Sequence, residues 1–434
     1  MRLKIENFAQ IRYADVIMDG ITVIAGENNT GKSTVGKILF SLFNATSDIE
    51  NKIISQRTAE IRNMCRRYLR NGIVYESGEE KRVWNASPFS TATAIARQVD
   101  NVLKNENAEM DKVREGVHAV LKKAYGKDQR NPLVQEIENE IMGQIEKIIN
   151  LPEYAIITEL ISRYFGSMFR SQINSLIMPE LKAKLTLYIK RSKNILLFEG
   201  NICADYSSEI DLVNQAIYID NPFVIDKLSD DYGLDMAETY LVRLLTRRPD
   251  QDPMDGIISS VLAKEKLSEV YAAVRSVIPG NIVEGQNDKY FLEQENYKQP
   301  VSVGSLSTGM KSFLILKMLI ERGQIKEKDV LILDEPEIHL HPQWQVVYAE
   351  LVVLLQKYFH LSVIVTTHSP YFMDAINVFS VKHGIDQGVH YYLSSVEDGW
   401  AAMEDVTDHI DSIYKKMASS IQVLDSLRYE LNNQ

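Results

Sequence analysis

The sequence is poor in cysteine and has no long apolar run. Its two cysteines, Cys65 and Cys203, lie far apart and in no metal-binding spacing, which argues against a disulfide-stapled fold and a zinc site. No apolar stretch approaches the roughly 20 residues that span a membrane. Residues 1–8 lack the apolar core of a signal peptide. These absences predict a cytoplasmic protein with reduced thiols and no membrane segment.

Positive charge is also in short supply, with 48 Lys and Arg residues against 59 Asp and Glu residues. The net charge of −11 at pH 7 argues against a protein that coats nucleic acid, although it leaves room for a local basic groove. Hydrophobic residues make up 45% of the chain and charged residues 25%, as in an ordinary globular protein. A chain of 434 residues buries about three quarters of its unfolded surface, so a large core is expected.

Residues 26–33, Gly-Glu-Asn-Asn-Thr-Gly-Lys-Ser, match a phosphate-binding loop at every defined position. A buried strand is predicted over 21–25 and a helix over 34–43, which is the context that such a loop needs. The loop N–H groups would surround a β-phosphate, with Lys32 on the β- and γ-phosphates and Ser33 on Mg²⁺. A chance glycine turn before a helix is the alternative. The residues predicted to bind ATP in this segment are Gly26, Glu27, Asn28, Asn29, Thr30, Gly31, Lys32, Ser33 and Thr34.

Two buried strands later in the chain end in candidate catalytic residues. The strand predicted over 330–333 leads to Asp334 and Glu335, and a carboxylate there is costly unless a cation or a partner compensates it. Asp334 is the candidate Mg²⁺ ligand, and Glu335 is the candidate general base for the attacking water. A structural pair of acids without such a role is the alternative. The strand predicted over 361–365 leads to His368, which is expected to contact the γ-phosphate rather than serve as an ordinary core histidine.

The segment 306–310, Leu-Ser-Thr-Gly-Met, leads directly into a helix predicted over 310–320. Small residues at a helix start expose backbone N–H groups and make an anion site. Since the phosphate loop already holds this subunit's nucleotide, Ser307 and Gly309 are expected to cap the γ-phosphate held by a second copy of the chain. A plain helix N-cap is the alternative.

Together these motifs resemble the ABC-type ATPases of the SMC, RecF and OLD group. Residues 306–310 look like the signature loop, and residues 334–345 look like the Walker B segment and following loop of the OLD-like subgroup. The opening residues 4–8, Lys-Ile-Glu-Asn-Phe, are similar to the family as well. The resemblance implies an α/β P-loop head of the ABC type, ATP and Mg²⁺ as cofactors, and a homo-oligomer built from head-to-head dimers. It also implies a glutamine that contacts Mg²⁺ and the attacking water, for which Gln172 is the candidate.

Departures from the OLD pattern narrow the expected function. Roughly 55 residues follow Phe379, which we take as too few for the metal-dependent Toprim nuclease domain of OLD proteins. The acidic residues in this stretch are interpreted as one solvated helix face: Glu404, Asp405, Asp408 and Asp411. His339 and His341 are interpreted as part of a loop that crosses the dimer interface rather than as a metal pair. The chain therefore resembles compact ATPases of anti-phage systems of the Septu, retron and PARIS types, which act with a separately encoded nuclease or toxin.

The rest of the chain predicts a discontinuous head with an insertion. From 45 to 171, apolar residues recur at three- and four-residue spacing among charges of both signs, which predicts a mainly helical insertion. Further strands are predicted over 2–8, 185–189, 195–198, 216–219, 281–284, 290–293 and 391–393. The predicted domains are an ATPase head of residues 1–44 and 172–434, the helical insertion 45–171, and a second helical segment within the head, 226–279.

A basic stripe in the insertion makes DNA a candidate partner. Its residues are spaced for one face of a helix: Arg62, Arg66, Arg67 and Arg70. Such a stripe can contact phosphates with salt-sensitive affinity, and a solvated helix face is the alternative. A weaker second cluster is formed by Arg243, Arg247 and Arg248.

Two function hypotheses follow from these residues and the resemblance. The first is an ATP-gated dimeric switch in bacterial anti-phage defence, in which ATP closes two heads and hydrolysis by Glu335 reopens them. A separately encoded effector then does the damage. The second is a RecF- or SMC-like DNA-binding ATPase in repair or recombination. The nucleotide-binding subunit of a membrane transporter fits poorly, because a large insertion follows the phosphate loop.

Overall fold

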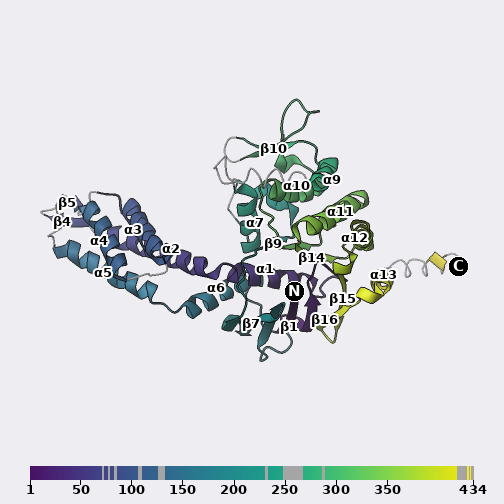
Figure 1. Cartoon of the computed structure of the whole chain (residues 1–434), viewed down its shortest axis with the longest axis horizontal. Coiled ribbons are helices and arrows are strands. Elements are labelled where there is room, and N and C mark those ends of the chain that lie inside the picture. The colour runs from purple at the N-terminus through teal and green to yellow at the C-terminus, as the bar shows by residue number, and fades with distance from the viewer. Residues whose placement is uncertain are drawn as a thin grey trace. The chain divides into compact units, whose positions relative to one another are not determined.

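The computed structural model of the chain consists of two units (Figure 1). The first comprises Met1–Ser47 and Leu160–Gln434, and the second comprises Asp48–Glu159. The structure describes residues 1–70, 73–76, 79–82, 86–105, 110–125, 132–229, 233–247, 267–285, 289–417, 428–429 and 431. The domain boundaries at 44/45 and 171/172 that we inferred from the sequence remain predictions.

The first unit is built on one 11-stranded sheet with the order β8-β7-β6-β1-β2-β16-β15-β3-β14-β13-β9. Its strands are β1 (Arg2–Phe8), β2 (Ile11–Ile17), β3 (Ile21–Gly26), β6 (Ala183–Ile189), β7 (Ser192–Glu199), β8 (Ile202–Ser208), β9 (Ala216–Ile219), β13 (Val330–Asp334), β14 (Ser362–Thr367), β15 (Val389–Glu397) and β16 (Trp400–Asp405). From β15 to β9 neighbouring strands are parallel, whereas β8 to β2 form an antiparallel extension. The carboxyl ends of the parallel strands therefore meet at one edge, where ligands bind in open α/β sheets.

The remaining elements of the first unit surround this sheet. Its helices are α1 (Lys32–Thr46), α6 (Glu153–Met168, which begins in the second unit), α7 (Met236–Thr246), α9 (Ser268–Val277), α10 (Thr308–Glu321), α11 (Pro342–Phe359), α12 (Pro370–His383) and α13 (Asp411–Met417). A small sheet contains β10 (Asn281–Glu284), β11 (Tyr290–Glu293) and β12 (Val301–Ser302). Short 3-10 turns occupy Pro222–Lys227, Val303–Ser305, Asp386–Gly388 and Thr407–His409. Among the described residues, none of the helices has the length and apolarity that crossing a bilayer demands.

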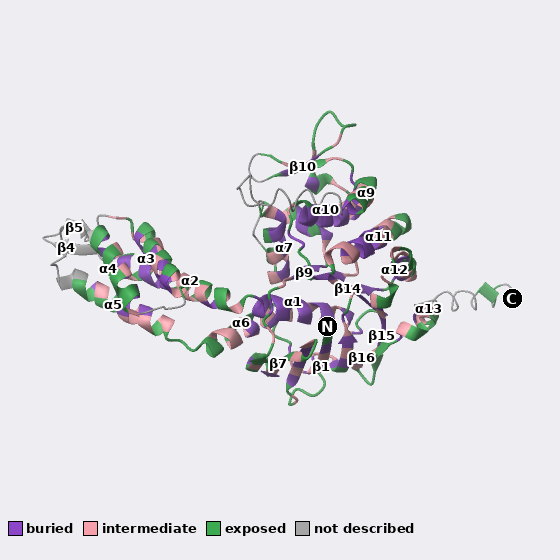
Figure 2. Ribbon diagram, viewed as in Figure 1, coloured by how far each residue is buried: buried purple, intermediate pink, exposed green. Residues whose placement is uncertain are grey.

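Helices cover both faces of the parallel part of the sheet. On one face α1 contacts β3, β9, β13 and β14. On the other face α10, α11 and α12 share a core with Leu331 and Leu333 of β13. Ile332 points the opposite way, toward Gly36 of α1, as the alternation of side chains along a strand requires. Figure 2 shows the buried residues concentrated along these strands and along α1 and α10.

The second unit is mainly helical. It contains α2 (Ile49–Arg70), α3 (Pro88–Leu103), α4 (Met110–Tyr125), α5 (Pro132–Ile149) and a hairpin of β4 (Ile73–Glu76) and β5 (Glu79–Arg82). The apolar faces of the four helices pack into a core of their own, in which α2 contacts α3 and α5. Four helices thus occupy most of the stretch in which helical spacing recurs, and the hairpin was not predicted.

Most of the predicted strands occur in the first unit. The strands predicted over 2–8, 21–25, 216–219, 281–284 and 290–293 correspond to β1, β3, β9, β10 and β11. The strands predicted over 185–189 and 195–198 correspond to β6 and β7, which pair as an antiparallel hairpin. Strands β2 and β8 were not predicted. The middle of the helical segment predicted over 226–279 lies outside the described residues.

The prediction of a single strand beyond residue 390 is wrong, because β15 pairs antiparallel with β16. The helix-face interpretation of the acidic residues is wrong for the same reason. Glu404 and Asp405 end β16, Asp408 lies in a 3-10 turn, and Asp411 begins α13. All four are exposed, and Ala401 is the buried residue of β16. Because burial does not alternate along this short strand, its sequence carries no strand pattern.

Candidate nucleotide-binding site

The predicted phosphate loop connects β3 to α1 at the carboxyl edge of the sheet. Gly26 has a φ of 156°, and a Cβ there would lie 2.4 Å from the carbonyl oxygen of Ser394 on β15. Gly31 has a φ of 84°, a left-handed conformation that favours glycine. Ser394 also supports the loop, because its hydroxyl donates a 2.6 Å hydrogen bond to the carbonyl of Thr30. Glu27, Asn28 and Asn29 are exposed, Thr30 and Lys32 are buried, and Gly31, Ser33 and Thr34 are half-buried.

Lys32 is folded into its own loop. Its ammonium group donates hydrogen bonds to the carbonyls of Gly26 at 2.9 Å and Glu27 at 2.5 Å. It also lies 3.7 Å from Oε1 of Glu335. Burial lowers the pKa of Lys32 more than the neighbouring acids Glu335 and Asp334 raise it. A cation buried in this way gains from a further anion, which a nucleotide phosphate would supply.

Three hydroxyl groups hold the carboxylate of Asp334. Ser33 donates to Oδ1 at 2.9 Å, and Thr366 donates to the same oxygen. Tyr218 donates to Oδ2 at 2.5 Å. Burial, reinforced by Asp334, raises the pKa of Tyr218 well above its usual value, so the phenol remains a donor. Ser33 and Asp334 present a hydroxyl and a carboxylate at one point, and such oxygen donors fit Mg²⁺.

Glu335 has a strained backbone. Its φ is 50°, a value that is uncommon outside glycine and that clusters at functional sites. Thr366 holds this conformation, because the N–H of Glu335 donates to the Thr366 carbonyl at 3.1 Å and to its hydroxyl at 3.0 Å. The carboxylate lies between two side chains, 3.7 Å from Nζ of Lys32 and 3.7 Å from Nδ1 of His368. The structure thus brings together three residues that the sequence predicted to act near the γ-phosphate.

A second acid, Glu337, lies behind His368. Its side chain is 2% exposed, and its Oε1 accepts hydrogen bonds from the Thr367 hydroxyl at 2.5 Å and from the backbone N–H of His368 at 2.9 Å. Burial raises the pKa of Glu337. Sequence analysis assigned it no role, because a glutamate in a loop after a strand is more often exposed.

The end of β9 contributes an acid that sequence analysis missed. Asp220 follows β9, the strand next to β13, and shares a cavity of about 30 Å³ with Asp334 and Glu335. A cavity of this size can hold a water molecule. Although Asp220 is exposed to solvent, the protein atoms packed around its carboxyl, together with repulsion from Asp235 and Asp334, raise its pKa to about 6. The sequence did contain a pattern that could have identified Asp220. An Asp-x-Pro segment follows β9 at 220–222, just as one follows the buried residues of β13 at 334–336.

The predicted signature residues line a different groove. Ser307 caps α10, accepting a 3.4 Å hydrogen bond from the backbone N–H of Met310. Gly309 is packed so closely that a Cβ there would lie 3.0 Å from the Trp344 ring. The groove has a volume of about 490 Å³ and is lined by Ser307, Thr308, Gly309, His339, His341, Gln343 and Trp344. None of these described lining residues belongs to the phosphate loop, so the two predicted phosphate contacts are separate within one chain.

Gln172 lies in the segment that connects α6 to β6. It is exposed in the loop after α6, and its neighbour Ile173 accepts a 2.9 Å backbone hydrogen bond from Ala9 at the end of β1. The pairing of the strands makes β1 parallel to β3, so this loop lies at the same sheet edge as the phosphate loop. Among the described residues, the hydrogen bonds to Asp334 do not involve Gln172. Its role at the metal remains a prediction.

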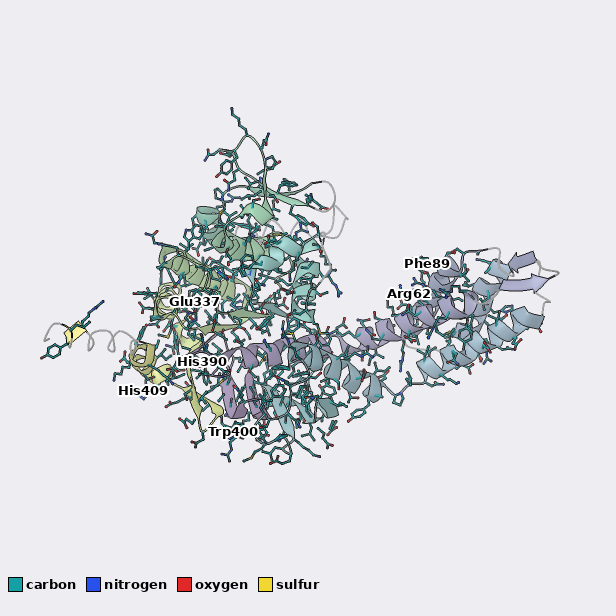
Figure 3. All side chains as sticks on the ribbon, turned by 180° about the vertical axis from the view of Figure 1, so that it is seen from behind. Arg62, Phe89, Glu337, His390, Trp400 and His409 are labelled. Carbon is teal, nitrogen blue, oxygen red and sulfur yellow. The ribbon has the colours of Figure 1, made fainter. Side chains whose placement is uncertain are left out.

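The predicted basic stripe lies on α2 in the second unit. The guanidinium of Arg66 lies 4.2 Å from the ring centre of Phe89, which is near the start of α3 and is 62% exposed. Figure 3 labels Phe89 and Arg62 on these neighbouring helices. Arg67 pairs with Glu60 at 3.4 Å, while Arg62, Arg66 and Arg70 have no carboxylate partner within the described part of the chain. Of the weaker cluster, Arg243 and Arg247 lie at the end of α7, and Arg248 lies outside the described residues.

The fold and the site define the class of protein. The AAA ATPase domain family, AAA_15, matches residues 1–373, and the chain belongs to that family. It is similar to Septu protein PtuA of Bacillus thuringiensis, with 31% identity over 123 residues that cover 24% of this chain and 30% of that protein. It is also similar to the "Retron Ec83 probable ATPase" of Escherichia coli, with 25% identity over 230 residues that cover 47% of this chain and 40% of that protein. The matches thus span less than half the length of these relatives.

Among solved structures, the SMC head domain from Thermotoga maritima aligns with 93% of this chain and 98% of its own length, at 11% identity and a TM-score of 0.39. A TM-score this low supports no inference about the present chain. The predicted α/β class and the predicted resemblance to Septu- and retron-type ATPases are confirmed by the sheet architecture, the family and the two curated relatives.

Proposed function

We propose that this chain binds and hydrolyses ATP and acts as a nucleotide-gated dimeric switch. The observation that carries the proposal is the meeting of three separate motifs at one sheet edge. Nζ of Lys32 lies 3.7 Å from Oε1 of Glu335, and the hydroxyl of Ser33 lies 2.9 Å from Oδ1 of Asp334. Nδ1 of His368, from the third motif, lies 3.7 Å from Oε2 of Glu335. Membership of the AAA ATPase domain family supports the same chemistry.

Each residue has a role that its surroundings support. The phosphate loop and Lys32 bind the phosphates through N–H groups and a buried cation. Mg²⁺ held by Ser33 and Asp334 would neutralise charge on the phosphate oxygens. Glu335 accepts a proton from the attacking water, and Asp220, which lines the same cavity, orients that water.

The second half of the site is proposed to come from another copy of the chain. The groove of Ser307 and Gly309 contains the N-terminal ends of α10 and α11, and both helix dipoles favour an anion there. A head-to-head dimer would place this groove over the γ-phosphate held by the partner. His339 and His341 line the same groove, which supports their assignment to the loop at the dimer interface. ATP then favours the closed dimer, and hydrolysis favours the open one.

The biological role that we propose is anti-phage defence in the cytoplasm, with a separately encoded nuclease or toxin as the effector. The similarity to Septu PtuA and to the retron Ec83 ATPase supports this role. The helical second unit, which has a core of its own, is proposed to hold the effector.

Size-exclusion chromatography combined with phosphate release tests the switch. Glu335→Gln should slow turnover by about 10²–10⁴-fold, the usual contribution of a general base, and should accumulate as an ATP-bound dimer or higher oligomer. Lys32→Ala should neither bind ATP nor assemble. Lys193→Ala, which changes an exposed lysine on β7, is the matched control and should behave as the wild type. ATP hydrolysis at the wild-type rate by Glu335→Gln would mean that another residue is the base.

A second candidate function, DNA binding by the second unit, is favoured by one observation. The stripe on α2 combines Arg62 and Arg66, which have no carboxylate partner in the described part of the chain, with the exposed ring of Phe89. Arg97, two turns further along α3, is exposed as well. Cations beside an exposed aromatic ring are the combination that binds single-stranded nucleic acid.

Fluorescence anisotropy with a single-stranded oligonucleotide tests this surface at low and high salt. The double variant Arg62→Glu with Arg66→Glu should lose binding and flatten its salt dependence. Lys122→Glu with Lys123→Glu makes the same charge change on the exposed face of α4 and is the matched control. Equal losses in both double variants would point to net charge alone and would remove the case for this stripe.

A further inference from the structure

Glu337 is a buried acid whose hydrogen bonds converge on the segment that carries His368. It lies two residues after Glu335, and its Oε1 accepts from both the Thr367 hydroxyl and the backbone N–H of His368. Its other oxygen, Oε2, is buried and has no hydrogen-bond partner among the described residues. Leaving a buried carboxylate oxygen without a partner is costly, so a merely structural role does not explain this residue type.

The imidazole of His368 lies between two carboxylates. Its Nδ1 is 3.6 Å from Oε1 of Glu337 and 3.7 Å from Oε2 of Glu335. Lys32 interacts electrostatically with both carboxylates and lies 3.7 Å from Glu335. Two further acids, Asp334 and Asp220, line the cavity next to Glu335. The side chain of His368 is 46% exposed, so its far edge remains free to meet a ligand.

A structural role at this position would require only an acceptor. Glutamine could accept the same two hydrogen bonds through its Oε1 without the cost of a buried charge. The full negative charge becomes useful only when a positive charge lies next to it. An imidazole that donates from both nitrogens must be cationic, and an adjacent carboxylate stabilises that form.

We propose that Glu337 is a positioning residue that holds His368 as an imidazolium, with Nδ1–H directed to Glu337 and Nε2–H directed to a γ-phosphate oxygen. The hydrogen bond from the His368 backbone N–H to Glu337 fixes the position of the histidine backbone. The negative charge of Glu337 favours the form of the imidazole that is protonated on both nitrogens. This inference rests on the proposed ATPase function. Through it, Glu337 in the loop after β13 would orient His368, at the end of β14, toward the γ-phosphate.

A double-mutant cycle with Glu337→Gln and His368→Ala tests the proposal. Glu337→Gln should keep its melting temperature and its KM for ATP, but kcat should fall by roughly tenfold, as expected for loss of a charge-assisted hydrogen bond. In the His368→Ala background, Glu337→Gln should have no further effect on kcat. The alkaline limb of the kcat–pH profile should also move to lower pH in Glu337→Gln, because the imidazolium loses a neighbouring negative charge.

Two results would overturn the inference. One is wild-type kcat in Glu337→Gln while His368→Ala is slow, and the other is an additive effect of the two changes, which would indicate a structural role. Glu337→Asp keeps the charge and provides the test if the glutamine variant does not fold, since its pH profile should stay close to that of the wild type. Absence of ATP turnover in the wild-type chain would instead contradict the proposed function, so the two failures are distinguishable.

Discussion

The hydroxyl of Ser33 donates a 2.9 Å hydrogen bond to the carboxylate of Asp334, although 301 residues separate them along the chain. The contact exists because β14 lies between β3 and β13, so the carboxyl ends of these three strands form one edge. Ser33 is held there by the first turn of α1, and Asp334 by the end of β13. A cation that binds to the Ser33 hydroxyl therefore also meets the acid that is proposed to hold it.

Two inactive variants are expected to restore ATP turnover when they are mixed. Lys32→Ala removes the phosphate-loop cation, and Ser307→Arg fills the signature groove, so each alone should be inactive. A mixed dimer has one intact site, made from the phosphate loop of the Ser307→Arg chain and the signature loop of the Lys32→Ala chain. ATP at that intact site holds the mixed dimer together, whereas neither variant forms an ATP-bound dimer with itself. Since a mixed dimer has one intact site of two, up to about half of wild-type turnover should return, measured as phosphate release.

The matched control for this experiment is Ser276→Arg, which adds the same side chain at an exposed position on α9 and should leave turnover unchanged. Full activity of Ser307→Arg alone, or no recovery in a mixture that forms dimers, would contradict a site shared between two chains.

Asp220 and Gln172 compete for one role at the attacking water. Asp220 shares a cavity with Glu335, so Asp220→Ala should lower kcat by roughly tenfold or more, while Gln172→Ala should change it little. Steady-state phosphate release measures both. Asp211→Ala, at an exposed position before β9, is the control for loss of an acid. A large effect of Gln172→Ala with normal turnover of Asp220→Ala would reverse the assignment.

Two helical glycines should respond oppositely to alanine. A Cβ on Gly36 would lie 2.7 Å from Cγ2 of Ile332, whereas a Cβ on Gly143 of α5 would meet nothing within 4 Å. Both changes improve helix propensity by about 1 kcal/mol, but overpacking at Gly36 costs on the order of 1–3 kcal/mol. Chemical denaturation followed by circular dichroism should therefore show Gly143→Ala as the more stable variant and Gly36→Ala as the less stable one. Stabilisation by Gly36→Ala would mean that β13 and α1 are less tightly packed than described.

The two cysteines should be unreactive in the folded protein. Burial raises the pKa of both the Cys65 thiol and the Cys203 thiol to about 12. At pH 8 both remain protonated, so a thiol reagent should react about 10³-fold more slowly than with the unfolded chain, whose thiols titrate near pH 8.5. Since the folded-state pKa is raised, the associated stability is complete below about pH 8.5 and is lost as pH rises toward 12. Rapid labelling of the native protein at pH 8 would contradict this burial.

The motifs could be located from the sequence because each depends on residues that are adjacent along the chain. A phosphate loop needs Gly26 and Gly31 at fixed spacing, and the ends of apolar strands mark Asp334 and His368. The partners of these residues carried no such signal. Thr366 is opposite Asp334, and Tyr218 is opposite Ile332, only through the register of parallel strands, and both look like ordinary buried strand residues in the sequence.

Adjacent residues were thus enough to specify a phosphate loop, two strand-end acids and a helix start rich in small residues, since local geometry and burial cost impose those residue types. Which side chains surround each acid is determined by the tertiary structure. Packing of both sheet faces sets the order β3-β14-β13-β9, and that order brings Asp220 to Asp334, places Glu337 behind His368 and leaves Ser307 in a separate groove. Strand order depends on which faces bury together across hundreds of residues, and no local pattern encodes that choice.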